Sequence, residues 1–336
     1  MGGINYENLS YCVRPDEVDS FKKFSEKYGH TVDLIPDSFG PNVAHLAKGY
    51  DGISILGNDT CNREALEKIK DCGIKYLATR TAGVNNIDFD AAKEFGINVA
   101  NVPAYSPNSV SEFTIGLALS LTRKIPFALK RVELNNFALG GLIGVELRNL
   151  TLGVIGTGRI GLKVIEGFSG FGMKKMIGYD IFENEEAKKY IEYKSLDEVF
   201  KEADIITLHA PLTDDNYHMI GKESIAKMKD GVFIINAARG ALIDSEALIE
   251  GLKSGKIAGA ALDSYEYEQG VFHNNKMNEI MQDDTLERLK SFPNVVITPH
   301  LGFYTDEAVS NMVEITLMNL QEFELKGTCK NQRVCK

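Results

Sequence analysis

A glycine fingerprint in the middle of the chain constrains its fold more than any other feature. The stretch Thr151-Leu-Gly-Val-Ile-Gly156-Thr-Gly158-Arg-Ile-Gly161 joins a short apolar run, a glycine turn and the start of a helical pattern. Gly156 permits a sharp turn, Gly158 lets the backbone approach a pyrophosphate, and Gly161 lets a helix pack closely on a strand. The order of strand, turn and helix predicts a dinucleotide-binding unit, which begins about one domain's length into the chain.

Length and charge narrow the class of protein. The chain has 336 residues, enough for two domains, and its 44% hydrophobic and 25% charged content is typical of a globular protein. The formal net charge of −10 argues against nucleic acid or an anionic membrane as a partner. No apolar run reaches the roughly 18 residues of a membrane span, and no signal peptide opens the chain, so we expect a cytoplasmic protein.

The cysteines and histidines do not suggest a metal site. The five cysteines have no CxxC spacing, which favours reduced thiols: Cys12, Cys61, Cys72, Cys329 and Cys335. We therefore expect neither a structural metal nor a disulfide framework. Only six histidines are present, so each can be assessed separately.

Apolar runs rich in β-formers alternate with helical patterns along the whole chain, as in α/β proteins with parallel sheets. Before the fingerprint we expect strands at 9–13, 31–35, 53–56, 74–78 and 97–99, and from it onward at 151–155, 176–179, 205–208, 232–236, 258–263 and 295–298. The prediction is a Rossmann NAD-binding domain at 104–299, inserted into a flavodoxin-like substrate domain formed by 1–103 and 300–336. Both domains are expected to be doubly wound parallel sheets.

The sequence also predicts the structure of four segments outside the strands. Residues 1–8 are polar and are expected to form a frayed leader. Ser106-Pro107 starts a helix to about Arg123 that is apolar enough to be buried in a domain junction or a subunit interface. Residues 137–148 are rich in glycine and suggest a loop or dimer arm. A helix over 305–324, capped by a threonine, should pack on the first domain.

The acid after the fingerprint predicts which dinucleotide is bound. Asp180 follows the second strand, about twenty residues past the glycines, where a carboxylate accepts the ribose hydroxyls of NAD. Its charge would repel the 2′-phosphate of NADP. The alternative is that Asp180 only caps the following helix. Arg159, inside the motif, is expected to contact the pyrophosphate.

Three reactive side chains follow three neighbouring strands. Arg239 follows the strand at 232–236, His300 follows the one at 295–298, and Glu268 lies on the loop after Asp263. In parallel sheets, ligands sit beyond the carboxyl ends of the strands, so these groups should meet at one edge. A guanidinium binds a carboxylate with two prongs, an imidazolium supplies a proton to a ketone oxygen, and a carboxylate behind it holds the tautomer.

We therefore assign Arg239, Glu268 and His300 as the catalytic residues for reduction of a 2-keto acid. Each has a simpler interpretation taken alone: a surface arginine, part of an acidic stretch, or a satisfied loop histidine. The other histidines lack a matching carboxylate at a strand end: His30, His45, His209, His218 and His273. His209 closes the strand at 205–208 and is expected near the cofactor.

Several motifs together resemble the D-2-hydroxyacid dehydrogenase family over nearly the whole chain. They are Thr79-Arg-Thr-Ala-Gly-Val-Asn-Asn-Ile-Asp88, Asn101-Val-Pro-Ala-Tyr-Ser-Pro107, the glycine fingerprint, His209-Ala-Pro211, Asn236-Ala-Ala-Arg-Gly240, the loop 263–268 and Thr298-Pro-His300. Tyr105-Ser-Pro-Asn108 and the segment 298–305 are most similar to the branch of D-lactate, (R)-2-hydroxyisocaproate and aryllactate dehydrogenases. Within that branch the chain most resembles the (R)-phenyllactate dehydrogenases of clostridia, which reduce arylpyruvates.

The resemblance implies roles for further residues. It implies the same three catalytic residues as above, NAD as the cofactor, and homodimers joined through the nucleotide domain. The residues that it places against NAD are Arg159, Ile160, Asp180, Ala210, Pro211, Asn216, Ala237, Ala238 and Asp263. The full cofactor site that we expect also includes Gly156, Gly158, Gly161, His209 and Arg239. Those that the resemblance places around the substrate are Ala82, Gly83, Tyr105, Arg239 and His300.

The substrate itself is less constrained. We expect the loop 56–60 to face the substrate side chain, with Gly57 leaving room for a ring and Tyr105 and Phe303 as aromatic walls. Asp59 on that loop would oppose a second carboxylate. An arylpyruvate is the leading substrate, and pyruvate or 2-ketoisocaproate, giving D-lactate or (R)-2-hydroxyisocaproate, is the alternative. A non-enzymatic alternative is an NAD-sensing binding module of the same fold.

Overall fold

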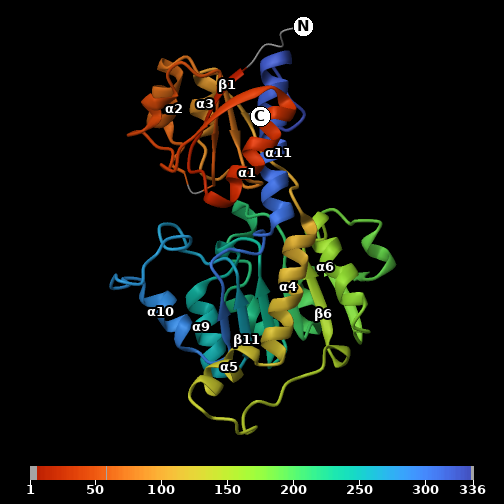
Figure 1. Cartoon of the computed structure of the whole chain (residues 1–336). Coiled ribbons are helices and arrows are strands. Elements are labelled where there is room, and N and C mark those ends of the chain that lie inside the picture. Colours follow the sequence, from red (N-terminus) through yellow and green to blue (C-terminus); the bar gives the residue numbers. More distant parts are fainter. Residues whose placement is uncertain (1–5, 58, 334–336) are drawn as a thin grey trace. The chain divides into compact units, whose positions relative to one another are not determined.

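The computed structural model describes residues 6–57 and 59–333 and divides the chain into two units (Figure 1). Unit 1 comprises Met1–Ser106 and Tyr304–Lys336, and unit 2 comprises Pro107–Phe303. Each unit is built around one sheet whose neighbouring strands run almost entirely parallel. The predicted α/β class with two parallel sheets is confirmed.

Unit 1 has a sheet of flavodoxin-like order. Its strands are β1 (Tyr6–Ser10), β2 (His30–Leu34), β3 (Gly52–Ile55), β4 (Tyr76–Thr79), β5 (Asn98–Ala100) and β13 (Gln332–Arg333), in the spatial order β13-β5-β4-β3-β1-β2. The two-residue β13 pairs antiparallel with β5, while the other pairs are parallel. The helices are α1 (Val18–Tyr28), α2 (Arg63–Asp71), α3 (Phe89–Glu94) and α11 (Asp306–Lys326). The order 2-1-3-4-5 of the first five strands is one of the two common doubly wound arrangements.

The long helix α11 packs on unit 1, as its length and cap predict. The Thr305 side chain accepts a hydrogen bond from the amide of Ala308 and so caps the helix. Val313, Leu317 and Leu320 on its inner face are fully buried in a cluster with Phe21 and Phe24 of α1. The C-terminal helix therefore completes the hydrophobic core of the unit that the N-terminal residues begin.

The first strand begins earlier than predicted. Tyr6–Asn8 are three of the five residues of β1 and pair in parallel with β2, starting at Tyr6 opposite His30. The expectation of a leader over these residues is wrong, while its first five residues lie outside the described part of the chain. The start of the strand was predicted too late because Asn8 and Ser10 are polar, although both are fully buried within the strand.

Unit 2 has the strand order of a Rossmann fold. Its strands are β6 (Thr151–Ile155), β7 (Lys175–Tyr179), β8 (Glu192–Tyr193), β9 (Ile205–Leu208), β10 (Val232–Asn236), β11 (Ile257–Leu262) and β12 (Val295–Ile297). Their spatial order is β12-β11-β10-β9-β6-β7-β8, so the order reverses between β6 and β9. Such a reversal is where open parallel sheets bind their ligands.

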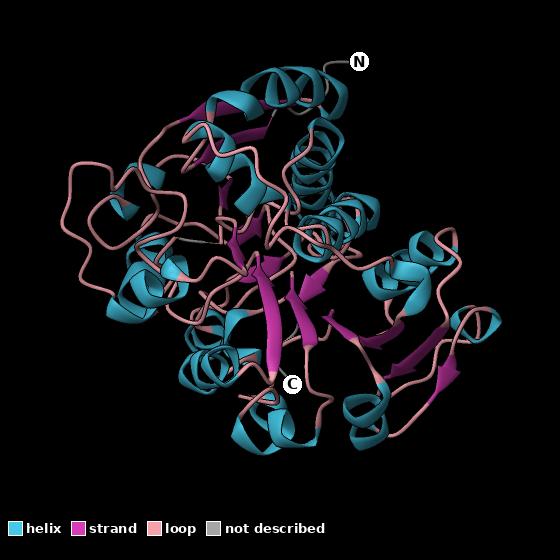
Figure 2. Ribbon diagram, turned by 90° about the horizontal axis from the view of Figure 1, so that it is seen from below, coloured by secondary structure: helices cyan, strands magenta, loops and turns pink. Residues whose placement is uncertain are grey.

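Helices cover both faces of this sheet, as Figure 2 shows. They are α4 (Pro107–Thr122), α5 (Ile125–Glu133), α6 (Arg159–Ser169), α7 (Leu196–Glu202), α8 (Lys222–Lys227), α9 (Ser245–Ser254) and α10 (Asp284–Ser291). The apolar helix α4 is buried within unit 2, where Leu117 and Leu121 join the core cluster of β6 and α6. A Cβ atom on Gly167 of α6 would lie 2.4 Å from Cδ1 of Ile115, so the two helices touch at a glycine.

Candidate active site

At Gly156 and Gly161, the glycine turn between β6 and α6 leaves no room for a side chain. Gly156 has φ of 91°, and a Cβ atom there would lie 2.5 Å from the amide nitrogen of Ala210. A Cβ atom on Gly161 would lie 1.9 Å from the carbonyl oxygen of Gly156. By contrast, a Cβ atom on Gly158 would meet open space, and this residue caps α6 without a side-chain hydrogen bond. The first amides of an eleven-residue helix thus lie beside an open approach, which is the geometry of a phosphate cradle.

Asp180 lies at this turn and does not cap a helix. Its Oδ2 accepts a 2.6 Å hydrogen bond from the amide of Thr157, and its Oδ1 accepts one from the amide of Phe182. After Asp180 the chain runs through bends to a 3-10 turn at Ala187–Lys189. The alternative that Asp180 only caps a following helix is therefore wrong. The expected binding of the ribose hydroxyls by Asp180 stays a prediction.

His209 lies beside the same turn, and both nitrogens of its ring are buried. Within the described chain neither ring nitrogen has a hydrogen-bond partner. Burial lowers the pKa of His209 to about 3, so the ring is neutral. A buried polar group without a partner is costly unless a ligand satisfies it. The orphaned ring, the glycine cradle and Asp180 together fit an NAD molecule at this edge.

The loops after β9 and β10 hold the other residues expected near the cofactor. Asn216 binds its own loop, donating to the carbonyl of Pro211 at 2.7 Å and accepting from the amide of Thr213 at 2.8 Å. Asn236 at the end of β10 accepts from the amide of Ala238. The expected contacts of Ile160, Ala210, Pro211, Ala237 and Ala238 with a cofactor stay predictions.

Glu268 and His300 form a hydrogen-bonded pair in unit 2. The distance from His300 Nδ1 to Glu268 Oε1 is 2.7 Å, and the second carboxylate oxygen of Glu268 accepts from the amide of Tyr265. Burial alone would raise the pKa of Glu268, but the hydrogen bond and charge of His300, with the charge of Arg239, hold it below its ordinary value. The ionised carboxylate fixes Nδ1, which leaves Nε2 for a substrate.

Asp263 holds the loop that carries His300. Its side chain is buried, and its Oδ1 accepts from the Thr298 hydroxyl at 2.6 Å and from the Leu301 amide at 2.9 Å. Its Oδ2 accepts from the amide of Gly302 at 2.8 Å. His300 itself has φ of 53°, a strained conformation that persists only where surrounding contacts enforce it. The structure thus shows Asp263 as a support for His300, a role that the sequence did not suggest.

Arg239 projects from the loop after β10. Its carbonyl oxygen accepts from the side-chain amide of Asn236 at 2.9 Å, and its Nη1 donates to the carbonyl of Ala238 at 2.8 Å. The guanidinium is near enough to Glu268 to contribute to the lowered pKa of that carboxyl group. One edge of the unit 2 sheet therefore carries a guanidinium, a carboxylate and an imidazole.

The residues expected around the substrate from the first domain lie in unit 1. Asn101 donates to the carbonyl of Ala82 at 2.7 Å, and the Thr81 hydroxyl donates to the carbonyl of Gly83 at 2.7 Å. Asn311 of α11 donates to the carbonyl of Tyr105 at 2.7 Å. These bonds hold the backbone of all three segments, and their contact with a substrate stays a prediction.

Asp59 is buried in unit 1. Its side chain is buried, and its two oxygens accept from the amides of Phe39 and Leu56. Burial raises the pKa of Asp59 to about 6. Its carboxylate holds the backbone at Phe39 and Leu56, and its opposition to a second substrate carboxylate stays a prediction.

His218 contradicts the expectation that only His300 has a partner acid at a strand end. Its Nε2 lies 2.5 Å from Oε1 of Glu266, on the loop after β11. The pair is separated by 48 residues, and no local pattern links the two positions. The pair of His218 and Glu266 was therefore missed in the sequence analysis. The one available signal was that Glu266 and Glu268 lie two positions apart on one loop, so that each could bind a different partner.

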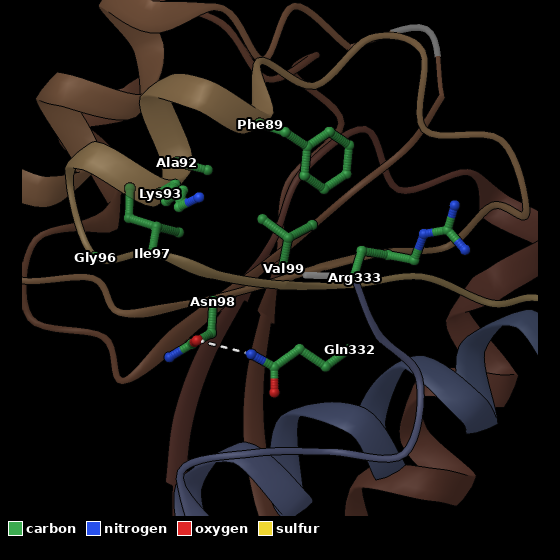
Figure 3. A pocket seen from close by; sticks show the side chains of 9 residues that line it. All are labelled: Phe89, Ala92, Lys93, Gly96, Ile97, Asn98, Val99, Gln332 and Arg333. Carbon is green, nitrogen blue, oxygen red and sulfur yellow. Dashed lines mark hydrogen bonds between the residues drawn. The ribbon is translucent and has the colours of Figure 1, made fainter. Parts of the chain in front are cut away.

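A surface pocket lies elsewhere in unit 1 (Figure 3). It is lined by residues of α3, β5 and β13 and their connections: Phe89, Ala92, Lys93, Gly96, Ile97, Asn98, Val99, Gln332 and Arg333. Gln332 donates to Asn98 at 2.9 Å across the strand pair. None of the residues predicted for cofactor or substrate lines this pocket.

Two further properties of the described residues bear on other functions. Residues 6–57 and 59–333 contain no group of three or more histidine, cysteine, aspartate or glutamate side chains arranged to hold a metal ion. Within the same residues, no helix has the length and apolar character needed to cross a membrane.

Comparison with known proteins points to one family. Residues 115–302 match the family described as "D-isomer specific 2-hydroxyacid dehydrogenase, NAD binding domain". An "Aromatic 2-oxoacid reductase" of Clostridium sporogenes is 98% identical over 98% of this chain and 99% of its own. A "D-lactate dehydrogenase" of Lactiplantibacillus plantarum is 42% identical over 96% of this chain and 98% of its own.

Solved structures agree with the sequence comparison. A structure of D-2-hydroxyisocaproate dehydrogenase has a TM-score of 0.90 and 37% identity, covering 98% of this chain and 100% of that one. The D-lactate dehydrogenase from Lactobacillus jensenii, solved with NAD+, has a TM-score of 0.83 and 34% identity, covering 98% and 100%.

Proposed function

The chain belongs to the D-2-hydroxyacid dehydrogenase family, and from this premise we propose that it reduces aromatic 2-oxo acids to (R)-2-hydroxy acids with NADH. Members of the family are NAD-dependent oxidoreductases that act on 2-hydroxy and 2-oxo acids. NADH, when bound, supplies the hydride. The single observation that carries the catalytic part of the proposal is the His300–Glu268 pair at 2.7 Å on the sheet edge that also carries Arg239.

The three side chains divide the reaction among them. The Arg239 guanidinium binds the substrate carboxylate in a forked geometry and polarises the neighbouring ketone. His300 donates a proton from Nε2 to the ketone oxygen, since its Nδ1 is held by Glu268. The ionised Glu268 stabilises the imidazolium that donates the proton.

The residues of unit 2 also explain why NAD suits this site. The amides at the start of α6 face the open space beside Gly158, and we propose that they bind the pyrophosphate together with Arg159. Asp180 is held at the glycine turn by the amide of Thr157 and would accept the ribose hydroxyls. We propose unit 2 as the NAD-binding domain and unit 1 as the substrate domain.

The proposal of an aromatic substrate rests on the relative from Clostridium sporogenes. That protein is named for aromatic 2-oxo acids and is 98% identical to this chain. The relatives named D-lactate dehydrogenase are much more distant, at 42% and 40% identity. We propose Tyr105 as an aromatic wall for the ring.

A substrate panel tests this choice. We expect kcat/KM with NADH to be at least about tenfold higher for phenylpyruvate and indolepyruvate than for pyruvate and 2-ketoisocaproate, because a buried ring adds apolar contact area. Oxidation of NADH is followed by its absorbance. A preference for pyruvate would replace the proposal with a D-lactate dehydrogenase. Binding of NADH without turnover of any of the four acids would favour the NAD-sensing module instead.

We also propose a homodimer joined through the apolar arm formed by α5 and residues 134–145 of unit 2. The arm is the yellow to yellow-green segment that includes α5 in Figure 1. Its apolar side chains are highly exposed, among them Leu134 at 81%, Leu139 at 84% and Ile143 at 84%. A patch of this kind in a folded protein marks an interaction surface. A second copy of the chain would bury it.

Sedimentation tests the arm. We expect the wild type to sediment as a dimer and the double variant Leu139→Asp, Ile143→Asp as a monomer, because two desolvated carboxylates cannot be placed in an apolar interface. The matched control is Ile181→Asp, which changes another exposed isoleucine of unit 2, at 78% exposure, outside the arm. A monomeric wild type, or a double variant that remains dimeric, would contradict the proposed interface.

We propose a cytoplasmic location because the described cysteines form no disulfides. The four cysteines in the described chain are free: Cys12, Cys61, Cys72 and Cys329. Reduced cysteines are typical of reducing compartments. Cell fractionation followed by assay of phenylpyruvate reduction tests the location.

A further inference from the structure

The loop after β11 carries two glutamates that bind different histidines. Glu268 pairs with His300, and Glu266, two positions earlier, pairs with His218 through a 2.5 Å contact between Oε1 and Nε2. Both histidines have φ of 53°, in the left-handed region. The reaction proposed above uses only the pair of Glu268 and His300. The other pair therefore needs a separate explanation.

Glu266 is buried and fully engaged by its surroundings. Its side chain is only 3% exposed. Its Oε2 accepts from the Ser245 hydroxyl at 2.9 Å and from the Ser245 amide at 3.3 Å, in the first turn of the ten-residue helix α9. The carboxylate thus lies where a helix dipole favours negative charge, while its Oε1 faces His218. Glu266 therefore links the loop after β11 to helix α9 and to the segment around His218.

His218 in turn is fastened to the loop of Arg239. The His218 amide donates to the carbonyl of Ala241 at 2.9 Å, and the Ile220 amide donates to the carbonyl of Leu242 at 2.9 Å. The segment around His218 therefore runs beside the residues that directly follow Arg239. Its backbone is joined to one catalytic loop and its side chain to the other.

The two catalytic loops also touch each other directly. A Cβ atom on Gly240 would lie 2.0 Å from the carbonyl carbon of Tyr265 and 2.4 Å from the amide nitrogen of Glu266. Gly240 follows Arg239, and Tyr265 donates its amide to Glu268. Because the loops are in contact, a displacement of one loop would also displace the other.

We propose that Glu266 and His218 form a positioning pair for the reaction, which holds the loop of Arg239 against the loop of Glu268. The pair acts through these two catalytic residues, so the inference rests on the roles that the proposed function gives them. Misplacement of a catalytic group by about 1 Å costs on the order of 10²-fold in rate. A rigid link between the loops is therefore a requirement of the chemistry.

The variant Glu266→Ala tests the pair. We expect kcat/KM for phenylpyruvate to fall on the order of 10²-fold, with a lower kcat and a higher KM, because both the proton donor and the carboxylate site are displaced. The Kd of NADH, measured by fluorescence, should rise much less than kcat/KM falls, since Asp180 and the glycine turn, which hold the rest of the cofactor, are not displaced. We expect Glu266→Gln to recover most of the activity, because its amide keeps an oxygen for Ser245 and an N–H for His218.

A double-mutant cycle and a matched control complete the test. His218→Asn removes the imidazole but tolerates the left-handed backbone, and its effect should not add to that of Glu266→Ala. Glu246→Ala is the control, since Glu246 lies in the same first turn of α9 and pairs with Arg288 at 2.9 Å on the surface. Its activity should stay within about twofold of the wild type.

Amide hydrogen exchange separates this inference from the proposed function. We expect Glu266→Ala to lose protection at residues 237–244 and 263–268, and Glu246→Ala to keep it there, whether or not the acid tested is a substrate. Unchanged protection and unchanged kcat/KM in Glu266→Ala would overturn the positioning pair. An equal loss of NADH affinity, additive effects in the cycle, or the same loss in Glu246→Ala would also overturn it. A wild type that reduces no 2-oxo acid would overturn only the proposed function.

Discussion

The variant His300→Gln is expected to lose about 10³-fold in kcat for 2-oxo acid reduction, a loss typical of removing a general acid. Glutamine fills similar space, and its side-chain N–H is far too weak an acid to protonate a developing alkoxide. Because Glu268 fixes Nδ1 of His300, a single nitrogen of the ring is left for the substrate. Stopped-flow absorbance of bound NADH gives the rate of the chemical step directly.

The same variant should still bind its cofactor. Asp180 and the glycine turn are fastened to each other and not to the loop of His300. We therefore expect the Kd of NADH to change by less than about threefold. The matched control is His45→Gln, which removes an exposed histidine of unit 1. A kcat within tenfold of the wild type would show that another group donates the proton.

The second large effect is expected for Arg239→Lys. Charge is retained, but an ammonium group cannot make the two parallel hydrogen bonds of a guanidinium to a carboxylate. Loss of a hydrogen bond to a charged group costs about 1.5–3 kcal/mol, so kcat/KM should fall by about 10- to 10²-fold, chiefly through a raised KM. Initial rates over a range of 2-oxo acid concentrations separate KM from kcat.

Arg288→Lys provides the control for this substitution. Arg288 pairs with Glu246 on the surface of unit 2, where a lysine keeps the ion pair at little cost. A KM for Arg239→Lys equal to that of the wild type would show that the substrate carboxylate is bound by other residues. Equal losses in both variants would indicate a general loss of structure in unit 2.

Much of the fold was predictable because its central strands are continuous apolar runs. The bounds of β6, β9 and β10 match the predicted ranges, since these strands are buried on both faces and end at glycines or polar turns. The first strand was misplaced because Asn8 and Ser10 are buried polar residues. The two-residue strands β8 and β13 carry no pattern long enough to detect.

The catalytic residues could be predicted because ligands bind at the carboxyl ends of parallel strands, where these residues lie. That rule led to Arg239, Glu268 and His300, because each follows a different strand of one sheet. The contacts that orient them were not predictable. Asp263 binding the loop of His300 and Glu266 binding His218 join residues 35 and 48 positions apart, and only the folded chain brings them together.

A crystal structure with NAD(H) and phenyllactate or phenylpyruvate tests the central claim most directly. The account predicts that His300 Nε2 lies within hydrogen-bond distance of the oxygen on C2, that both terminal nitrogens of Arg239 contact the acid's carboxylate, and that C2 faces the nicotinamide ring. An acid bound with its C2 oxygen away from His300, or with its carboxylate held by other side chains, would contradict it.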